Sequence, residues 1–174
     1  MKIQRKITID ASIDKLWDIL GTNYADAGIW NSAVFISAQT AAQPKIESAP
    51  VSGRVCQTSL GPFTETINQF DETAHRIGYT ATGDAMPGFV KGLHGYWSLN
   101  RVSANRTEVN MMLTVDIAFP FNVLMGWMMK LQFNGAIKSS LGDLKHYAET
   151  GKPHPRKIKA DGTKKARTAR QALA

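Results

Sequence analysis

The feature that most constrains this chain is a long amphipathic segment, residues 120–150. It contains no internal proline, Pro120 suits the first turn of a helix, and Gly151 followed by Pro153 is a typical helix end. At 1.5 Å per residue such a helix is about 45 Å long. Its apolar face repeats at three and four residues: Met125, Met129, Phe133, Ala136, Ile137, Ser140, Leu144, and Tyr147 or Ala148. A sheet built by the rest of the chain can wrap around it.

The upstream sequence alternates apolar and polar residues with the period of β-strands. Residues 2–9 predict a first strand, followed by a helix capped by Asp10 or Ser12 and a second short helix or turn at 26–30. Further strands are expected at 34–40, 54–60, 63–70, 77–82, 92–102 and 107–118. Because most of the turns between them are short, we expect an antiparallel sheet. The predicted class is α+β, with six or seven strands around one long helix.

The net charge of +7 belongs to one end of the chain. Residues 152–174 hold eight lysines and arginines against a single acid, Asp161, so residues 1–151 are formally neutral. The composition predicts a folded domain over 1–151 and a solvated, flexible basic tail over 152–174. Two other interpretations of the tail remain open. It could contact nucleic acid through phosphate attraction, or form a short basic helix at an anionic surface.

Several function classes lack their sequence patterns. No run of about 18 apolar residues occurs, and the first ten residues lack an apolar leader, so we expect a soluble cytoplasmic protein. The single cysteine, Cys56, fits a small core residue. The four histidines are scattered without paired spacing, so no metal site is predicted. Nucleotide-binding and hydrolase motifs are missing, and no cofactor is expected.

The order of elements resembles the helix-grip, or START-like, fold of the polyketide cyclase/dehydrase and lipid-transport families. The segments that carry the resemblance are 10–12 with 16–20 after the first strand, the Trp-Asn pair 30–31, 96–99 with 107–109 in the last hairpin, and 141–145 in the last helix. The resemblance covers about residues 1–150. It implies an apolar cavity between sheet and helix, and it supplies no catalytic signature, since these families vary the contents of a shared container.

Apolar residues on the inward faces of the predicted elements are the candidate ligand-binding residues. The loop 83–91, here called the gate loop, adds an apolar Met-Pro-Gly-Phe tip that could cover a cavity entrance. For any one of these residues, a filled core is the simpler alternative. The candidates are Trp30, Phe63, Ile67, Tyr79, Met86, Phe89, Trp97, Met111, Leu113, Met125, Met129 and Phe133.

Glu65 and Tyr79 are the candidate catalytic residues. Alternation turns Glu65 inward together with Phe63, Ile67 and Gln69, and a buried carboxyl with Tyr79 or Gln69 as its partner could serve as a general acid or base. A carboxylate facing solvent or paired with a basic neighbour is the simpler alternative. Three functions follow: binding of a lipid, isoprenoid or aromatic polyketide-like molecule; a cyclase or dehydratase; or a scaffold whose tail contacts nucleic acid or an anionic surface.

Overall fold

One curved antiparallel sheet forms the body of the molecule. The computed structural model describes residues 1–84 and 86–171. The sheet has seven strands in the order β1-β7-β6-β5-β4-β3-β2, so every strand from β2 to β7 pairs with its sequence neighbour and β1 closes on β7. The strands are β1 (Lys2–Ile9), β2 (Val34–Gln39), β3 (Gly53–Thr58), β4 (Gly61–Asp71), β5 (Arg76–Thr82), β6 (Val90–Ser103) and β7 (Arg106–Ile117).

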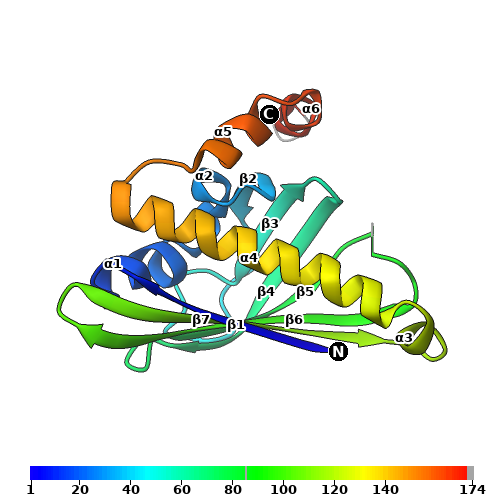
Figure 1. Ribbon diagram of the computed structural model, residues 1–174, viewed down its shortest axis with the longest axis horizontal. Coiled ribbons are helices and arrows are strands. Elements are labelled where there is room, and N and C mark those ends of the chain that lie inside the picture. The colour runs from blue at the N-terminus through cyan, green and yellow to red at the C-terminus, as the bar shows by residue number, and fades with distance from the viewer. Residues whose placement is uncertain (85, 172–174) are drawn as a thin grey trace.

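The helices lie on one side of the sheet. Figure 1 shows the long helix α4 running across the sheet, which curves around it. Short helices follow β1, as predicted, and the α+β helix-grip architecture is confirmed. The helices are α1 (Ile13–Trp17), the π-helix η1 (Asp18–Thr22), the 3-10 helix η2 (Tyr24–Asp26), α2 (Ala27–Trp30), α3 (Phe121–Leu124), α4 (Gly126–Thr150), α5 (Pro155–Asp161) and α6 (Lys164–Gln171).

The predicted terminal helix is interrupted near its start. Gly151 ends it in the left-handed conformation with φ of 71°, where glycine carries no Cβ penalty, as predicted. The prediction of a continuous helix from Pro120 was wrong. Helix α3 ends at Leu124, and Met125 adopts φ −118° and ψ −7° before α4 begins. No helix in the described part of the chain is long and apolar enough to cross a membrane.

The inward faces of the central strands agree with the alternation of the sequence. The alternation predicts that Ile77 of β5, Leu93 and Trp97 of β6, and Val109 of β7 face α4. Ile77, Trp97 and Val109 are buried, and Leu93 is half-buried. Gln69 is the exception. The pairing of β4 with β5 shifts between Ile67 and Gln69, and this bulge turns Gln69 outward to an exposed position.

The basic segment after α4 is helical over most of its described length. Helices α5 and α6 pack near β2 and β3, and Lys157 is buried, with its Nζ donating to Val34 O at 2.7 Å and to Asp161 Oδ1 at 2.6 Å. Arg156 of α5 also pairs with the buried Asp143 of α4. Residues 155–171 are therefore attached to the domain, because Arg156 and Lys157 of this segment bond to groups of α4 and β2. Residues 172–174 lie outside the described part.

Candidate ligand cavity

A cavity of about 420 Å³ lies between the N-terminal half of α4 and the end of the sheet nearest the gate loop. That volume is within the range of small-molecule sites in proteins. Among the described residues around it, only Ser59 and Gln132 are polar. The lining consists of Ala33, Ser59, Leu60, Phe63, Met86, Pro87, Val90, Leu93, Met129, Gln132, Phe133 and Ala136.

Four of the candidate ligand-binding residues line this cavity. Phe63 comes from β4, Met86 from the gate loop, and Met129 and Phe133 from successive turns of α4. The structure therefore brings together side chains that are far apart in the sequence. Leu93 and Ala136 also line it, and the sequence had placed Leu93 on an inward face and Ala136 on the apolar stripe of the helix.

The other candidates are not among the residues that line this cavity. Tyr79 stacks its ring over Gly95, where a Cβ would overlap it, and Met125 occupies the junction of α3 and α4. Phe89 of the gate loop stacks on Phe121 with ring centroids 4.7 Å apart. The remaining candidates are buried in the hydrophobic core: Trp30, Ile67, Trp97, Met111 and Leu113. Ala85 of the gate loop lies outside the described residues.

Glu65 faces inward and is held by an arginine and a tyrosine. Its Oε2 accepts hydrogen bonds from Tyr24 Oη at 2.6 Å and Arg54 Nε at 2.8 Å, and Arg54 Nη2 lies 2.8 Å away. Arg54 also donates to Tyr24 O at 2.7 Å and stacks over the Tyr24 ring. The prediction that Tyr79 or Gln69 is the hydrogen-bonding partner of Glu65 was wrong. Tyr24 and Arg54 come from η2 and β3, so only the folded chain brings them to Glu65.

This polar cluster adjoins the cavity wall. Strand pairing sets Arg54, Glu65, Ala81 and Leu93 in one row across β3 to β6, and Leu93 lines the cavity. Phe63, another lining residue, is two positions from Glu65 on the same face of β4, about 7 Å along the strand. Only the small side chain of Ala81 separates Glu65 from Leu93 in that row. A polar group at the inner end of a bound molecule could therefore reach the cluster.

Burial keeps the tyrosines of this region protonated. It raises the pKa of Tyr24 well above its usual value, and burial followed by the charge of Glu65 raises the pKa of Tyr79 in the same direction. Burial also raises the pKa of the Cys56 thiol to about 12. Burial acts to lower the pKa of Arg54, but the Glu65 carboxylate outweighs it and the pKa rises. Tyr79 therefore keeps its proton at neutral pH, so it can donate a hydrogen bond but cannot act as a phenolate base.

No group of three or more histidine, cysteine, aspartate or glutamate side chains within 1–84 and 86–171 is arranged to hold a metal ion. His94 illustrates this. Its Nδ1 lies 3.0 Å from Thr80 Oγ1 and its Nε2 lies 3.5 Å from Asp116 Oδ2, and about half of the His94 and Asp116 side chains is exposed.

The curved sheet around one long helix defines the helix-grip fold. The model of the polyketide cyclase/dehydrase and lipid transport family matches residues 1–149, and the chain belongs to that family. The match ends within the last turn of α4, so α5 and α6 lie beyond it. No curated protein matches the chain.

Solved structures share the fold at low sequence identity. A START superfamily protein from Mycobacterium smegmatis is 13% identical with a TM-score of 0.69, covering 85% of this chain and 97% of its own. The protein XoxI from Bacillus cereus is 14% identical with a TM-score of 0.69, covering 88% and 99%. The di-domain ARO/CYC BexL of the BE-7585A biosynthetic pathway is 16% identical with a TM-score of 0.66, covering 84% and 45%.

Proposed function

We propose that this protein binds a small hydrophobic molecule, such as a lipid, an isoprenoid or an aromatic polyketide-like compound, in the cavity beside α4. The observation that carries the proposal is the cavity itself, about 420 Å³ with an almost wholly apolar lining. Removing apolar ligand surface from water supplies the driving force. The flexible side chains of Met86 and Met129 suit ligands of variable shape. Membership of a family described by lipid transport and cyclisation supports the same class of ligand.

Filling the cavity tests this proposal. Native mass spectrometry of freshly purified protein should show a co-purified apolar adduct, and oleic acid or 9,10-anthraquinone should raise the Tm. Ala136→Phe places a ring in the cavity and should abolish both effects. Lys138→Phe is the matched control, because residue 138 is not among the lining residues and lies about 200° further around the helix. A wild-type protein with neither adduct nor Tm shift, or an Ala136→Phe variant that keeps both, would contradict the proposal.

A cyclase or dehydratase-type reaction in the same cavity is the second candidate. It is favoured by the Glu65 carboxylate, held by Tyr24 and Arg54 in the row of residues that ends at the cavity wall. A buried, protonated Tyr79 next to that row could donate a hydrogen bond to a substrate. In this mechanism the cavity folds a polyketide-like chain, the Glu65 carboxylate accepts a proton from it, and Tyr79 hydrogen-bonds to the reacting group.

Two conservative variants test catalysis separately from binding. Glu65→Gln and Tyr79→Phe should each lower turnover of an aromatic polyketide-like substrate while the ligand-induced rise in Tm persists. Glu65→Gln leaves Arg54 buried without its counter-charge, so this variant is expected to lose stability. Tyr79→Phe keeps the ring that packs over Gly95 and therefore separates chemistry from folding. Full turnover in both variants would remove these residues from the mechanism.

A further inference from the structure

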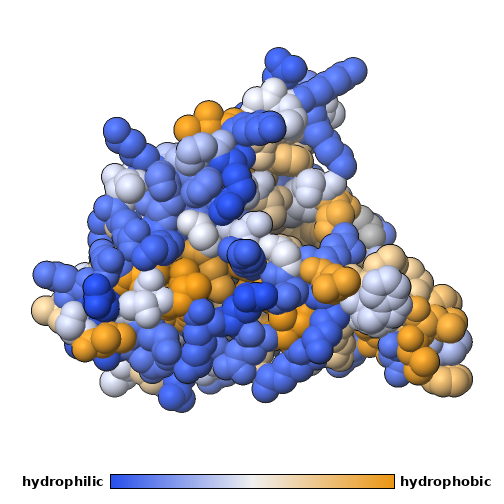
Figure 2. Space-filling view, viewed as in Figure 1, coloured by the Kyte–Doolittle hydropathy of each residue, from blue (hydrophilic) through white to orange (hydrophobic). Residues whose placement is uncertain are grey.

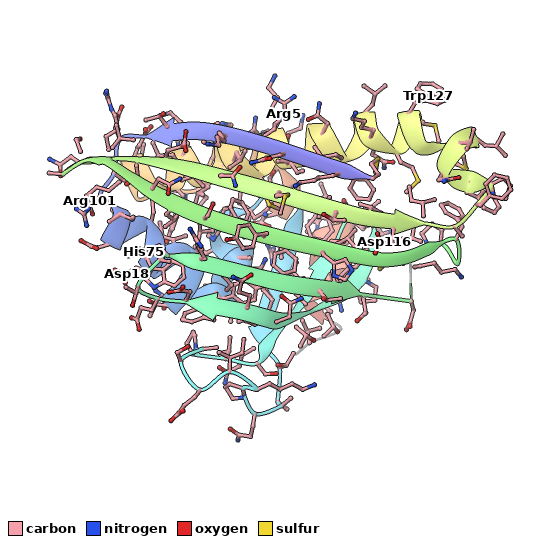
Figure 3. The ribbon with its side chains drawn as sticks, turned by 90° about the horizontal axis from the view of Figure 1, so that it is seen from below. Arg5, Asp18, His75, Arg101, Asp116 and Trp127 are labelled. Atoms are coloured by element: carbon pink, nitrogen blue, oxygen red, sulfur yellow. The ribbon has the colours of Figure 1, made fainter. Side chains whose placement is uncertain are left out.

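Large apolar side chains gather on the outer surface where α3 meets α4. We call this surface the α3 patch, and its members are between 39% and 82% exposed. Figure 2 shows apolar residues concentrated at the projecting end of the molecule that carries α3. Figure 3 shows Trp127 pointing away from the sheet at this end. The patch consists of Phe119, Phe121, Val123, Leu124, Trp127, Met128 and Leu131.

The patch is not explained by folding. Other exposed large apolar side chains in the described residues stand singly on different elements, as Ile29, Val102 and Ile158 do. A contiguous apolar surface costs solubility and marks a site of interaction. Tryptophan and phenylalanine at such a site suit an interface between water and hydrocarbon, because their rings tolerate both sides.

The same elements carry the patch on one side and the cavity on the other. Met129 and Phe133 of α4 line the cavity, whereas Trp127 and Leu131, on the intervening positions, face solvent. Phe121 of the patch stacks on Phe89 of the gate loop. A partner covering the patch therefore sits beside the cavity entrance.

Charge indicates which partner fits. The only charged residue in 118–135 is Lys130, and the segment contains no acid. The exposed Lys91 closes the gate loop. On the opposite rim of the cavity, Lys165 of α6 donates to Ser59 O. The nearest acid in the groove beside Trp127 is Asp116, which faces His94. Apolar side chains framed by lysines complement a lipid surface with anionic headgroups.

We propose that the α3 patch docks the protein onto an anionic lipid surface, with Trp127 and its apolar neighbours inserted and Lys130 at the headgroups. The patch projects from the molecule rather than lying flat, which suits a deformable lipid phase better than the self-complementary face of a second copy. Docking requires no molecule in the cavity, so its test is separate from that of the proposed binding function.

Tryptophan fluorescence reports docking directly. Trp127 is 67% exposed, whereas the other three tryptophans, Trp17, Trp30 and Trp97, are at most 5% exposed. Adding phosphatidylcholine vesicles that contain phosphatidylglycerol should shift the emission of Trp127 to shorter wavelength and carry the protein with them in flotation. Trp127→Phe should abolish the spectral change and still float, because phenylalanine also inserts.

Matched variants locate the binding surface. Trp127→Ser with Leu131→Ser should lower the vesicle partition coefficient at least about tenfold, since two large apolar side chains no longer insert. Lys130→Gln should lower the partition coefficient about fivefold on anionic vesicles and leave binding to pure phosphatidylcholine vesicles unchanged. Val102→Ser, at a distant exposed apolar site, should bind as the wild type does. Lys164→Gln with Lys165→Gln on α6 should have a smaller effect than Trp127→Ser with Leu131→Ser.

Three outcomes would overturn the proposal. One is a wild-type protein that fails to float with anionic vesicles. Another is a Trp127→Ser, Leu131→Ser variant that floats like the wild type, or that loses less binding than the α6 variant. The third is self-association: a blue shift of Trp127 that depends on protein concentration without vesicles, together with a dimer in sedimentation velocity that Leu131→Ser removes, would assign the patch to a second copy.

Discussion

The two ends of helix α4 differ in what surrounds them. In the C-terminal half, Leu141, Leu144 and Ala148 are buried against the sheet, and the carboxylate of Asp143 is fully buried. In the N-terminal half, Trp127 and Leu131 face solvent. The difference shows that one helix can serve two purposes. Since one end anchors it in the core, the other can present apolar side chains to a cavity and to the outer surface without loss of the fold.

The largest expected effect contrasts two leucines of this helix. Leu144→Ala should lower the free energy of unfolding by about 2–5 kcal/mol, because a fully buried side chain leaves a cavity. Leu131→Ala, at a 64% exposed position, should change it by no more than about 0.5 kcal/mol. Urea denaturation measures both. Equal losses would mean that the N-terminal half is also part of the core.

The next effect concerns the attachment of α5 to α4. Asp143 accepts hydrogen bonds from Ser32 N at 2.9 Å and from Arg156 Nη2 at 2.9 Å. Asp143→Asn should lower the free energy of unfolding by about 1–3 kcal/mol, as expected for hydrogen bonds to a charged group. Arg156→Gln should cost a similar amount, because it leaves the fully buried Asp143 carboxylate without its arginine counter-charge. In a double-mutant cycle the two losses should be less than additive; simple additivity would show that the pair is not coupled.

Three glycines of α4 provide a smaller effect of either sign. Of the glycines at 126, 135 and 142, a Cβ at Gly126 or Gly135 would meet open space. Gly135→Ala should therefore raise the free energy of unfolding by about 1 kcal/mol. A Cβ at Gly142 would lie 2.9 Å from Arg156 Nη2, so Gly142→Ala should gain less or lose stability. Thermal unfolding compares them, and equal gains would show that Arg156 moves aside freely.

The smallest effect is the pH dependence of stability contributed by Glu149, near the C-terminal end of α4. Burial acts to raise the pKa of Glu149, but its bonds to Lys145 Nζ and Asp10 N outweigh this and lower the pKa below its ordinary value of 4.5. The ionised Glu149 carboxylate therefore contributes to the free energy of unfolding above about pH 4.5, and this contribution is lost as the pH falls through the lowered pKa. Glu149→Gln should flatten the acid side of the curve of unfolding free energy against pH. Lys130→Gln should leave it unchanged; a flattened curve there would contradict this assignment.

Much of the framework could be predicted from local patterns. Alternation placed Ile77 and Val109 on inward faces correctly, since each strand's period of two depends only on its own residues. Gln69 was misplaced because a bulge after Ile67 adds one residue, and no local pattern marks it. The break at Met125 could not be predicted either, because the helical periodicity of the sequence continues on both sides of it.

The candidate site was predictable only in part. Phe63 and Phe133 were candidates from their faces alone, and both line the cavity. The partners of Glu65 could not be foreseen, because Tyr24 and Arg54 belong to separate elements whose meeting depends on sheet curvature and on the position of η2. For the same reason, a count of charges could not show that Lys157 is buried against Val34 and Asp161.

The sequence by itself determined the strands, the long helix, its end at Gly151 and the apolar face that joins helix to sheet, because periodicity and turn chemistry act over a few residues. Only the tertiary structure decided at which point along that helix the side chains are no longer buried in the core. Whether Met129 faces a cavity and Trp127 faces water depends on how far the sheet extends beneath α4, which is set by contacts between residues distant in the chain.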